Sequence, residues 1–219
     1  MNIQYYGDYC FKITTKPAGR ATEDVVIWTD LPEKKTGIRT PFGHADLVLL
    51  SHVSPDDESL SGLKDDPSVV YTPGEYAVKG ASIVGHPSSR DEEWGAKHGR
   101  NTIFIFDSED VKICFLGALG HKIDEKTIEK IGDVDILFVP IGGGEALSPK
   151  DIDELIRAVA PKMVIPMHYT LDGASISAEG PEAFCKELGC SPDTRVSKLN
   201  FKKKDIEEKS MEIVFLEKS

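Results

Sequence analysis

Residues 45–57 read ADLVLLSHVSPDD, in which an apolar run ends near a histidine and two aspartates follow within five residues of it. The run 45–50 is apolar on both faces, as is typical of strands buried between two layers. Ligands commonly bind where such strands end at the edge of a sheet in layered α/β proteins. This stretch therefore predicts a buried strand with a functional loop at its C-terminal end.

Short β-branched runs recur along the chain and predict further strands. They are Val25–Thr29, Thr102–Phe106, Val111–Leu116, Val134–Pro140, Lys162–Met167 and Met211–Leu216. Helical spacing appears mainly in the second half and predicts helices over Ile123–Ile131, over the residues from Ser148 to Val159, and over Pro181–Leu188. The alternation predicts a layered α/β protein with two sheets, folded as one domain over residues 1–219.

The net charge of the chain limits the kinds of molecule that it is expected to bind. The 219 residues carry 37 acidic and 26 basic side chains, a formal net charge of -11. That charge argues against binding to nucleic acid or to an anionic membrane, both of which need a basic surface. There is no signal-like N-terminal layout and no apolar run of membrane-spanning length, so we expect a cytoplasmic protein. A small molecule is the expected partner, and homo-oligomerisation stays open.

Three histidines follow apolar runs, where strand ends are expected to converge. They are His52, His121 and His168. Neutral imidazole is the commonest transition-metal ligand, so this placement suggests a metal site. For any one of them alone, a structural histidine held by hydrogen bonds is the simpler interpretation.

The segment 45–57 resembles the metal-binding loop of the metallo-β-lactamase superfamily, which reads H-x-H-x-D-H after a buried strand. Further stretches over about residues 1–170 resemble the branch of that superfamily that is similar to ascorbate-6-phosphate lactonases, among them LGALGH (116–121) and VIPMHY (164–169). The resemblance implies an αββα four-layer sandwich with a dinuclear metal centre at the shared edge of two sheets. It also implies that His168 is a metal ligand.

The sequence departs from the family's ligand pattern at four positions. Ser54 stands in place of the second histidine of the loop, and Asp57 replaces its last histidine, while His52 and Asp56 are retained. The other departures are Arg90, in place of a further histidine, and Ala118, in place of the bridging aspartate. Arginine stays protonated and cannot ligate a metal. The first metal site is therefore expected to be lost, and the metal-bridging carboxylate with it.

Two interpretations of this cluster remain open. In the first, the protein is a hydrolase of a small substrate in which Asp56, Asp57 and His168 hold at most one Zn²⁺ or Mn²⁺ weakly, while His52 or His121 moves protons. In the second, no metal is bound, and the old pocket is vestigial or holds a small anion at Arg90.

Three further features belong to the same region. Tyr169 either contributes a hydroxyl to the pocket or only packs. The acidic segment DEEWG (91–95) is either a lid or a connection, and Asp30 is expected to orient the adjacent loop. The four cysteines, Cys10, Cys114, Cys185 and Cys190, are expected to be reduced and inert.

Overall fold

A computed structural model describes residues 1–16, 23–52, 59–144 and 146–219. In this part of the chain, one sheet has six strands in the spatial order β15-β1-β2-β3-β5-β7. Their bounds are β1 (Asn2–Gly7), β2 (Cys10–Thr15), β3 (Val25–Thr29), β5 (Leu47–Leu49), β7 (Ser68–Val70) and β15 (Leu199–Asn200). The strand predicted over residues 45–50 is therefore β5, and it runs parallel to its neighbours β3 and β7.

The second large sheet, again within the described residues, has seven strands in the order β16-β13-β12-β11-β10-β9-β8. Their bounds are β8 (Gly74–Val78), β9 (Ala81–Ser89), β10 (Arg100–Ser108), β11 (Val111–Phe115), β12 (Ile136–Pro140), β13 (Met163–Met167) and β16 (Glu212–Ile213). Strands β8 to β11 are antiparallel, whereas β11, β12, β13 and β16 are parallel. Two small pairs complete the strands: β4 (Gly43–His44) with β6 (Leu63–Lys64), and β14 (Arg195–Val196) with β17 (Phe215–Leu216).

The helices begin and end at residues that explain their bounds. They are α1 (Glu125–Ile131), α2 (Pro149–Val159), α3 (Glu182–Leu188) and α4 (Lys203–Ile206). Ser148 caps α2 by accepting a hydrogen bond from the backbone of Asp151. Gly189 ends α3 with a left-handed φ of 70°, which glycine adopts without steric cost. All three predicted helices are present.

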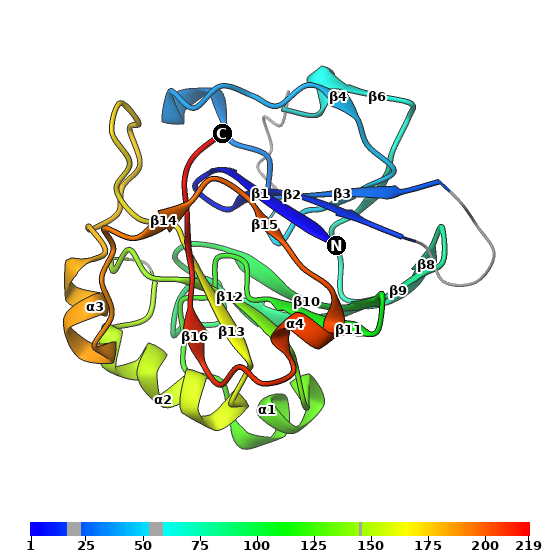
Figure 1. The fold of residues 1–219 in the computed structure, drawn as a ribbon. Coiled ribbons are helices and arrows are strands. Elements are labelled where there is room, and N and C mark those ends of the chain that lie inside the picture. The colour runs from blue at the N-terminus through cyan, green and yellow to red at the C-terminus, as the bar shows by residue number, and fades with distance from the viewer. Residues whose placement is uncertain (17–22, 53–58, 145) are drawn as a thin grey trace.

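The two sheets face each other across a shared apolar core (Figure 1), and Phe11 of β2 packs on Phe138 of β12 at 4.7 Å between ring centroids. Helices α1, α2 and α3 lie against the outer face of the seven-stranded sheet, where α2 buries Ile152 and Ile156. The outer face of the six-stranded sheet has its own small core around Trp28. In the described part of the chain between β3 and β6, the only helical segments are two short 3₁₀ helices, η1 (Lys34–Thr36) and η2 (Ser59–Gly62).

This architecture confirms the predicted sandwich. One predicted strand, Met211–Leu216, is instead divided into β16 and β17, which pair with different strands. No helix in the described part of the chain is both long and apolar enough to cross a membrane.

Candidate functional site

A cavity of about 370 Å³ lies where the carboxyl ends of strands from both large sheets meet. It is lined by Asp8, Tyr9, Asp30, Leu31, Glu33, Lys35, Thr36, His52, Arg90, His168, Ser175, Ile176 and Ser177. Four of its polar residues come directly after strands: Asp8 after β1, Asp30 after β3, Arg90 after β9 and His168 after β13. The sheets thus bring together side chains that are far apart in the sequence.

His168 is held on two sides. Its Nδ1 lies 2.6 Å from Oδ1 of Asp8, and its backbone N–H donates to the carbonyl of Asp8 at 2.9 Å. The imidazole stacks on the ring of Tyr9, with 4.3 Å between centroids and 11° between planes. Both Asp8 and His168 have left-handed backbone angles, with φ of 56° and 51°. The carboxylate and the stacked ring fix the orientation of the imidazole, leaving its Nε2 on the opposite side from Asp8.

His52 is held through Ser51. The Ser51 hydroxyl lies 2.9 Å from Nδ1 of His52 and donates to Oδ2 of Asp30, whose Oδ1 accepts the backbone N–H of Ser51 at 2.6 Å. Burial raises the pKa of Asp30 to about 7, against the opposing effect of the Ser51 hydrogen bonds. Burial, together with the nearby positive charge of Arg90, lowers the pKa of His52 to about 3. His52 is therefore neutral at physiological pH.

Arg90 places a permanent positive charge in this cavity. Its backbone N–H donates to the carbonyl of Gly99 at 3.1 Å, which fixes the chain just after β9. Burial dominates both neighbouring pKa values, and the charge of Arg90 opposes the rise in the pKa of Asp30 while adding to the fall in the pKa of His52. Arg90, which the sequence analysis predicts to be a pocket residue, is one of the residues that line this cavity.

Ala118 is buried beside the cavity but does not line it. Its backbone N–H donates to Oδ1 of Asn101 at 2.9 Å. A Cβ on the preceding Gly117 would lie 2.2 Å from Cβ of Ser51, so this loop passes directly against the residue that holds His52. The methyl group of Ala118 offers no metal ligand.

His121 and Tyr169 lie away from the cavity. His121 donates from Nδ1 to the carbonyl of Lys122 at 2.8 Å, and its ring lies 5.5 Å from that of Trp94. Tyr169 is 0% exposed and packs its ring on those of Tyr5 and Phe215, so it belongs to the core. Of its two expected roles, packing is the one that this position supports.

The segment 91–98 is a tightly bonded turn. The carboxylate of Asp91 accepts backbone N–H groups from Glu93, Gly95, Lys97 and His98, at 2.7 to 3.1 Å. These hydrogen bonds lower the pKa of Asp91 to about 2, against the effect of burial. Trp94 projects from this turn and is 65% exposed. The turn therefore has the construction of a fixed connection rather than that of a lid.

Several cavity residues were not found by sequence reasoning. Asp8 and Tyr9 follow directly after β1, and no motif in the sequence marks them as site residues. Ser175 and Ser177 come from the segment after His168, which is tied to the opposite rim by a hydrogen bond from the backbone of Ser175 to the carbonyl of Thr36 at 2.7 Å.

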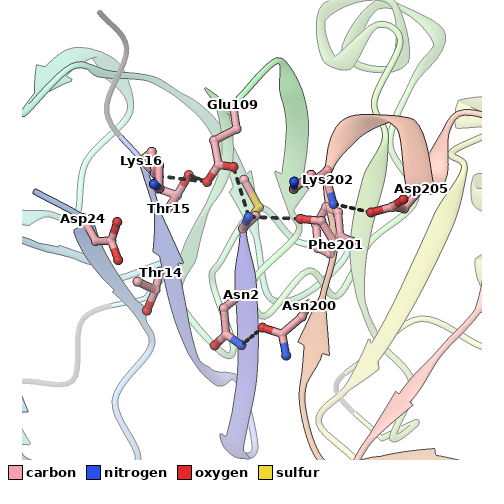
Figure 2. Close-up of a pocket in the computed structure, with 11 residues that line it drawn as sticks. Asn2, Thr14, Thr15, Lys16, Asp24, Glu109, Asn200, Phe201, Lys202 and Asp205 are labelled. Carbon is pink, nitrogen blue, oxygen red and sulfur yellow. Dashed lines mark hydrogen bonds and ion pairs between the residues drawn. The ribbon is translucent and has the colours of Figure 1, made fainter. Parts of the chain in front are cut away.

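A second cavity, of about 440 Å³, lies at the opposite end of β1 (Figure 2). There Glu109 accepts hydrogen bonds from the Met1 amino group at 3.1 Å and from the Thr15 hydroxyl at 2.9 Å, and Asn2 pairs with Asn200. Among the described residues its lining has no histidine or cysteine, and Glu109 is already bonded. We therefore place the candidate site in the first cavity.

The described residues do not fit a two-metal centre. No group of three or more His, Cys, Asp and Glu side chains among them is arranged to hold a metal ion. His52 and His168 each offer one ring nitrogen, but Arg90 brings a positive charge to the same cavity. The predicted ligands Asp56 and Asp57, and Ser54 beside them, lie outside the described residues.

Comparisons with known proteins agree with the fold. Residues 2–168 match the model of the beta-lactamase superfamily domain. A UPF0173 metal-dependent hydrolase of Listeria monocytogenes is 24% identical over 217 residues, covering 86% of this chain and 92% of that protein. A crystal structure from Thermotoga maritima, of a metallo-beta-lactamase superfamily protein, is 29% identical with a TM-score of 0.75 and covers 99% of each chain. The metallo hydrolase Igni18 of Ignicoccus hospitalis, 17% identical with a TM-score of 0.62, covers 92% of this chain and 99% of its own, and shares the fold. The family model spans most of the sequence, and this chain belongs to the beta-lactamase superfamily.

Proposed function

We propose that this protein binds a small anionic molecule in the cavity between the two sheets, with Arg90 as the anion-binding group. The observation that carries the proposal is the position of Arg90 in the cavity lining together with two histidines. A guanidinium has five N–H donors in a fixed planar arrangement, so it binds a carboxylate or phosphate while keeping other contacts. The positive charge of Arg90 attracts anions to the cavity, although the chain as a whole has a net charge of -11.

Two groups beside Arg90 are less charged than usual, although the lining also includes the carboxylates of Asp8 and Glu33. His52 is neutral, so it adds no second charge, and the raised pKa of Asp30 weakens its repulsion of an anion near neutral pH. Lys35 lies at the rim, where it pairs with Glu33 at 2.6 Å. A volume of about 370 Å³ falls within the range typical of small-molecule sites.

A second candidate function, hydrolysis with at most one metal ion, is favoured by the contact between His168 and Asp8. A metal-ligating histidine nearly always has its other ring nitrogen bonded to a carboxylate or carbonyl, as His168 has. In this interpretation Asp56, Asp57 and His168 would hold the ion, and the metal would supply an activated water molecule. The name of the Listeria relative supports this candidate.

Two measurements on purified protein separate these functions. Isothermal titration with phosphate and with small carboxylates tests the first, using Arg90→Gln and a control, Arg100→Gln, on an exposed residue of β10. We expect Arg90→Gln to weaken binding at least about tenfold, the size of one lost charged hydrogen bond. Equal binding by both variants would contradict the proposal.

Elemental analysis after loading with Zn²⁺ or Mn²⁺ and desalting tests the second candidate. About one ion per chain, lost in His168→Ala, supports it. Two ions per chain would contradict the expected loss of the first metal site. No retained ion would eliminate metal-dependent hydrolysis and leave the anion-binding proposal as the function to pursue.

A further inference from the structure

We infer that Cys185 and Cys190 are a dithiol pair that a peroxide oxidises to a disulfide within the chain. From the sequence we expect inert cysteines, and the way helix α3 ends changes that expectation for these two residues. The inference is independent of the cavity between the sheets and of the proposed anion binding. It gives the chain a separate modification site.

The end of α3 determines where Cys190 lies. The carbonyl of Cys185 accepts the backbone N–H of Gly189, whose φ is 70°, and also the backbone N–H of Cys190 at 3.0 Å. The second of these hydrogen bonds, from the residue after a left-handed glycine to the carbonyl five residues earlier, is typical of a Schellman motif. In that motif the side chains of the same two residues commonly pack against each other. Here both of those residues are cysteines.

The two thiols are in contact, as this motif predicts. They are hydrogen-bonded to each other across the helix end. A disulfide needs Cβ atoms that lie close together and side chains that point toward each other. Because the thiols of Cys185 and Cys190 already touch, the bond forms with side-chain rotation and little movement of the backbone. Its formation closes the six-residue loop CKELGC (185–190).

Access to solvent differs between the two cysteines. Cys185 is buried, with 5% of its surface exposed, whereas Cys190 is half-buried and lines a cavity of about 450 Å³ at the end of α3. A small oxidant therefore reaches the sulfur of Cys190 before that of Cys185. Cys10 and Cys114 are 0% exposed and lie in strands β2 and β11, so they serve as internal controls.

The oxidation balances with one molecule of hydrogen peroxide per chain. The thiolate of Cys190 attacks one peroxide oxygen and breaks the O–O bond, which gives a sulfenic acid and, after protonation, one water molecule. The sulfur of Cys185 then attacks the sulfenic sulfur, and the displaced hydroxyl leaves as a second water molecule. The two sulfur atoms lose two electrons, and the two thiol protons go to the two water molecules. Burial raises the pKa of both thiols, so little thiolate is present at neutral pH and the rate should rise with pH.

Digestion with trypsin gives a direct test, because Lys186 lies between the two cysteines. Cleavage places Cys185 in peptide 163–186 and Cys190 in peptide 187–195. The native chain would be treated with hydrogen peroxide at pH 7, 8 and 9, blocked with N-ethylmaleimide in denaturant, digested without reduction and analysed by mass spectrometry. We expect the two peptides to be joined and to separate again with dithiothreitol. The joined product should form about tenfold faster for each pH unit.

Two variants show which sulfur reacts. Cys190→Ser removes the attacking sulfur and should give no joined peptides, whereas the control Cys10→Ala should give as much of the joined product as the unmodified chain.

Four results with the unmodified chain would overturn the inference. They are a sulfinic acid at Cys190 with Cys185 still reduced, a disulfide between two chains, joined peptides that contain Cys10 or Cys114 in equal yield, and no reaction with the peroxide. A rate that stays constant between pH 7 and pH 9 would overturn the assignment of a buried thiol as the attacking group.

Discussion

Replacing His52 with glutamine should change how the stability of the protein depends on pH. Burial lowers the pKa of His52 from 6.5 to about 3, so between these values the unfolded chain binds a proton that the folded chain does not. The contribution of His52 to the free energy of unfolding is fully present above about pH 6.5, and it is lost as the pH falls toward the pKa of about 3 that His52 has in the folded protein. The slope is at most about 1.4 kcal/mol per pH unit, so the change between pH 4 and pH 6 is on the order of 2 to 3 kcal/mol. The side chain is only 18% exposed, so solvent screening reduces this little.

Asp30 acts in the opposite direction. Its pKa is raised from 3.8 to about 7, so the folded chain holds an extra proton between these values, and its stabilising effect is lost as pH rises through about 7. In the unmodified protein the two contributions nearly cancel between about pH 4 and pH 6.5. We therefore expect His52→Gln to lose stability as pH rises in this range and Asp30→Asn to gain it.

Urea unfolding at half-unit pH intervals from 4 to 7 measures these slopes, because the contributions of all other groups cancel when each variant is compared with the unmodified protein. The double variant with both substitutions is the control and should run parallel to the unmodified protein. If the difference in unfolding free energy between His52→Gln and the unmodified protein is constant across this range, His52 is not held neutral by burial and the reasoning fails.

Three further predictions concern local structure. Gly117→Ala should lower the free energy of unfolding by about 3 kcal/mol or more, because the new Cβ would lie 2.2 Å from Cβ of Ser51. Gly189→Ala is the control, since Gly189 has a similar φ but no atom within 4 Å of the new Cβ, and it should lower the free energy of unfolding by only about 1 kcal/mol. Thermal unfolding measures both. Ser148→Ala should lower the free energy of unfolding by about 1 kcal/mol through loss of the α2 cap, and an unchanged midpoint would contradict that role. Asp91→Ala should raise amide hydrogen exchange at residues 93–98 while leaving the exchange of β12 unchanged, and equal protection in both proteins would show that the carboxylate does not hold the turn.

The buried strands could be predicted from the sequence, because a strand that is buried on both faces needs a continuous run of apolar residues. Val25–Thr29 coincides with β3, and the helix stop at Gly189 follows from its left-handed backbone. Strands β8 and β9 were not predicted from apolar runs, since β8 is largely exposed and β9 contains Gly85 and Pro87. For such strands, pairing with a neighbour decides the structure more than the local pattern does.

The candidate site was only partly predictable for a related reason. His52, Arg90 and His168 were found because a motif or a strand end marked them. Asp8 has no marker of its own, and it joins the site only because β1 and β13 end at the same edge. Conversely, Tyr169 follows His168 directly, but the chain reverses the direction of its side chain, into the core.

The contact between Asp8 and His168 joins residues 160 positions apart, and it has a consequence for folding kinetics. Contacts of such long sequence separation make folding slow, because the intervening chain must be ordered before they form. The cavity therefore exists only once both sheets have closed on each other. A ligand bound there should slow unfolding and leave the folding rate unchanged, since the transition state has nothing for the ligand to bind.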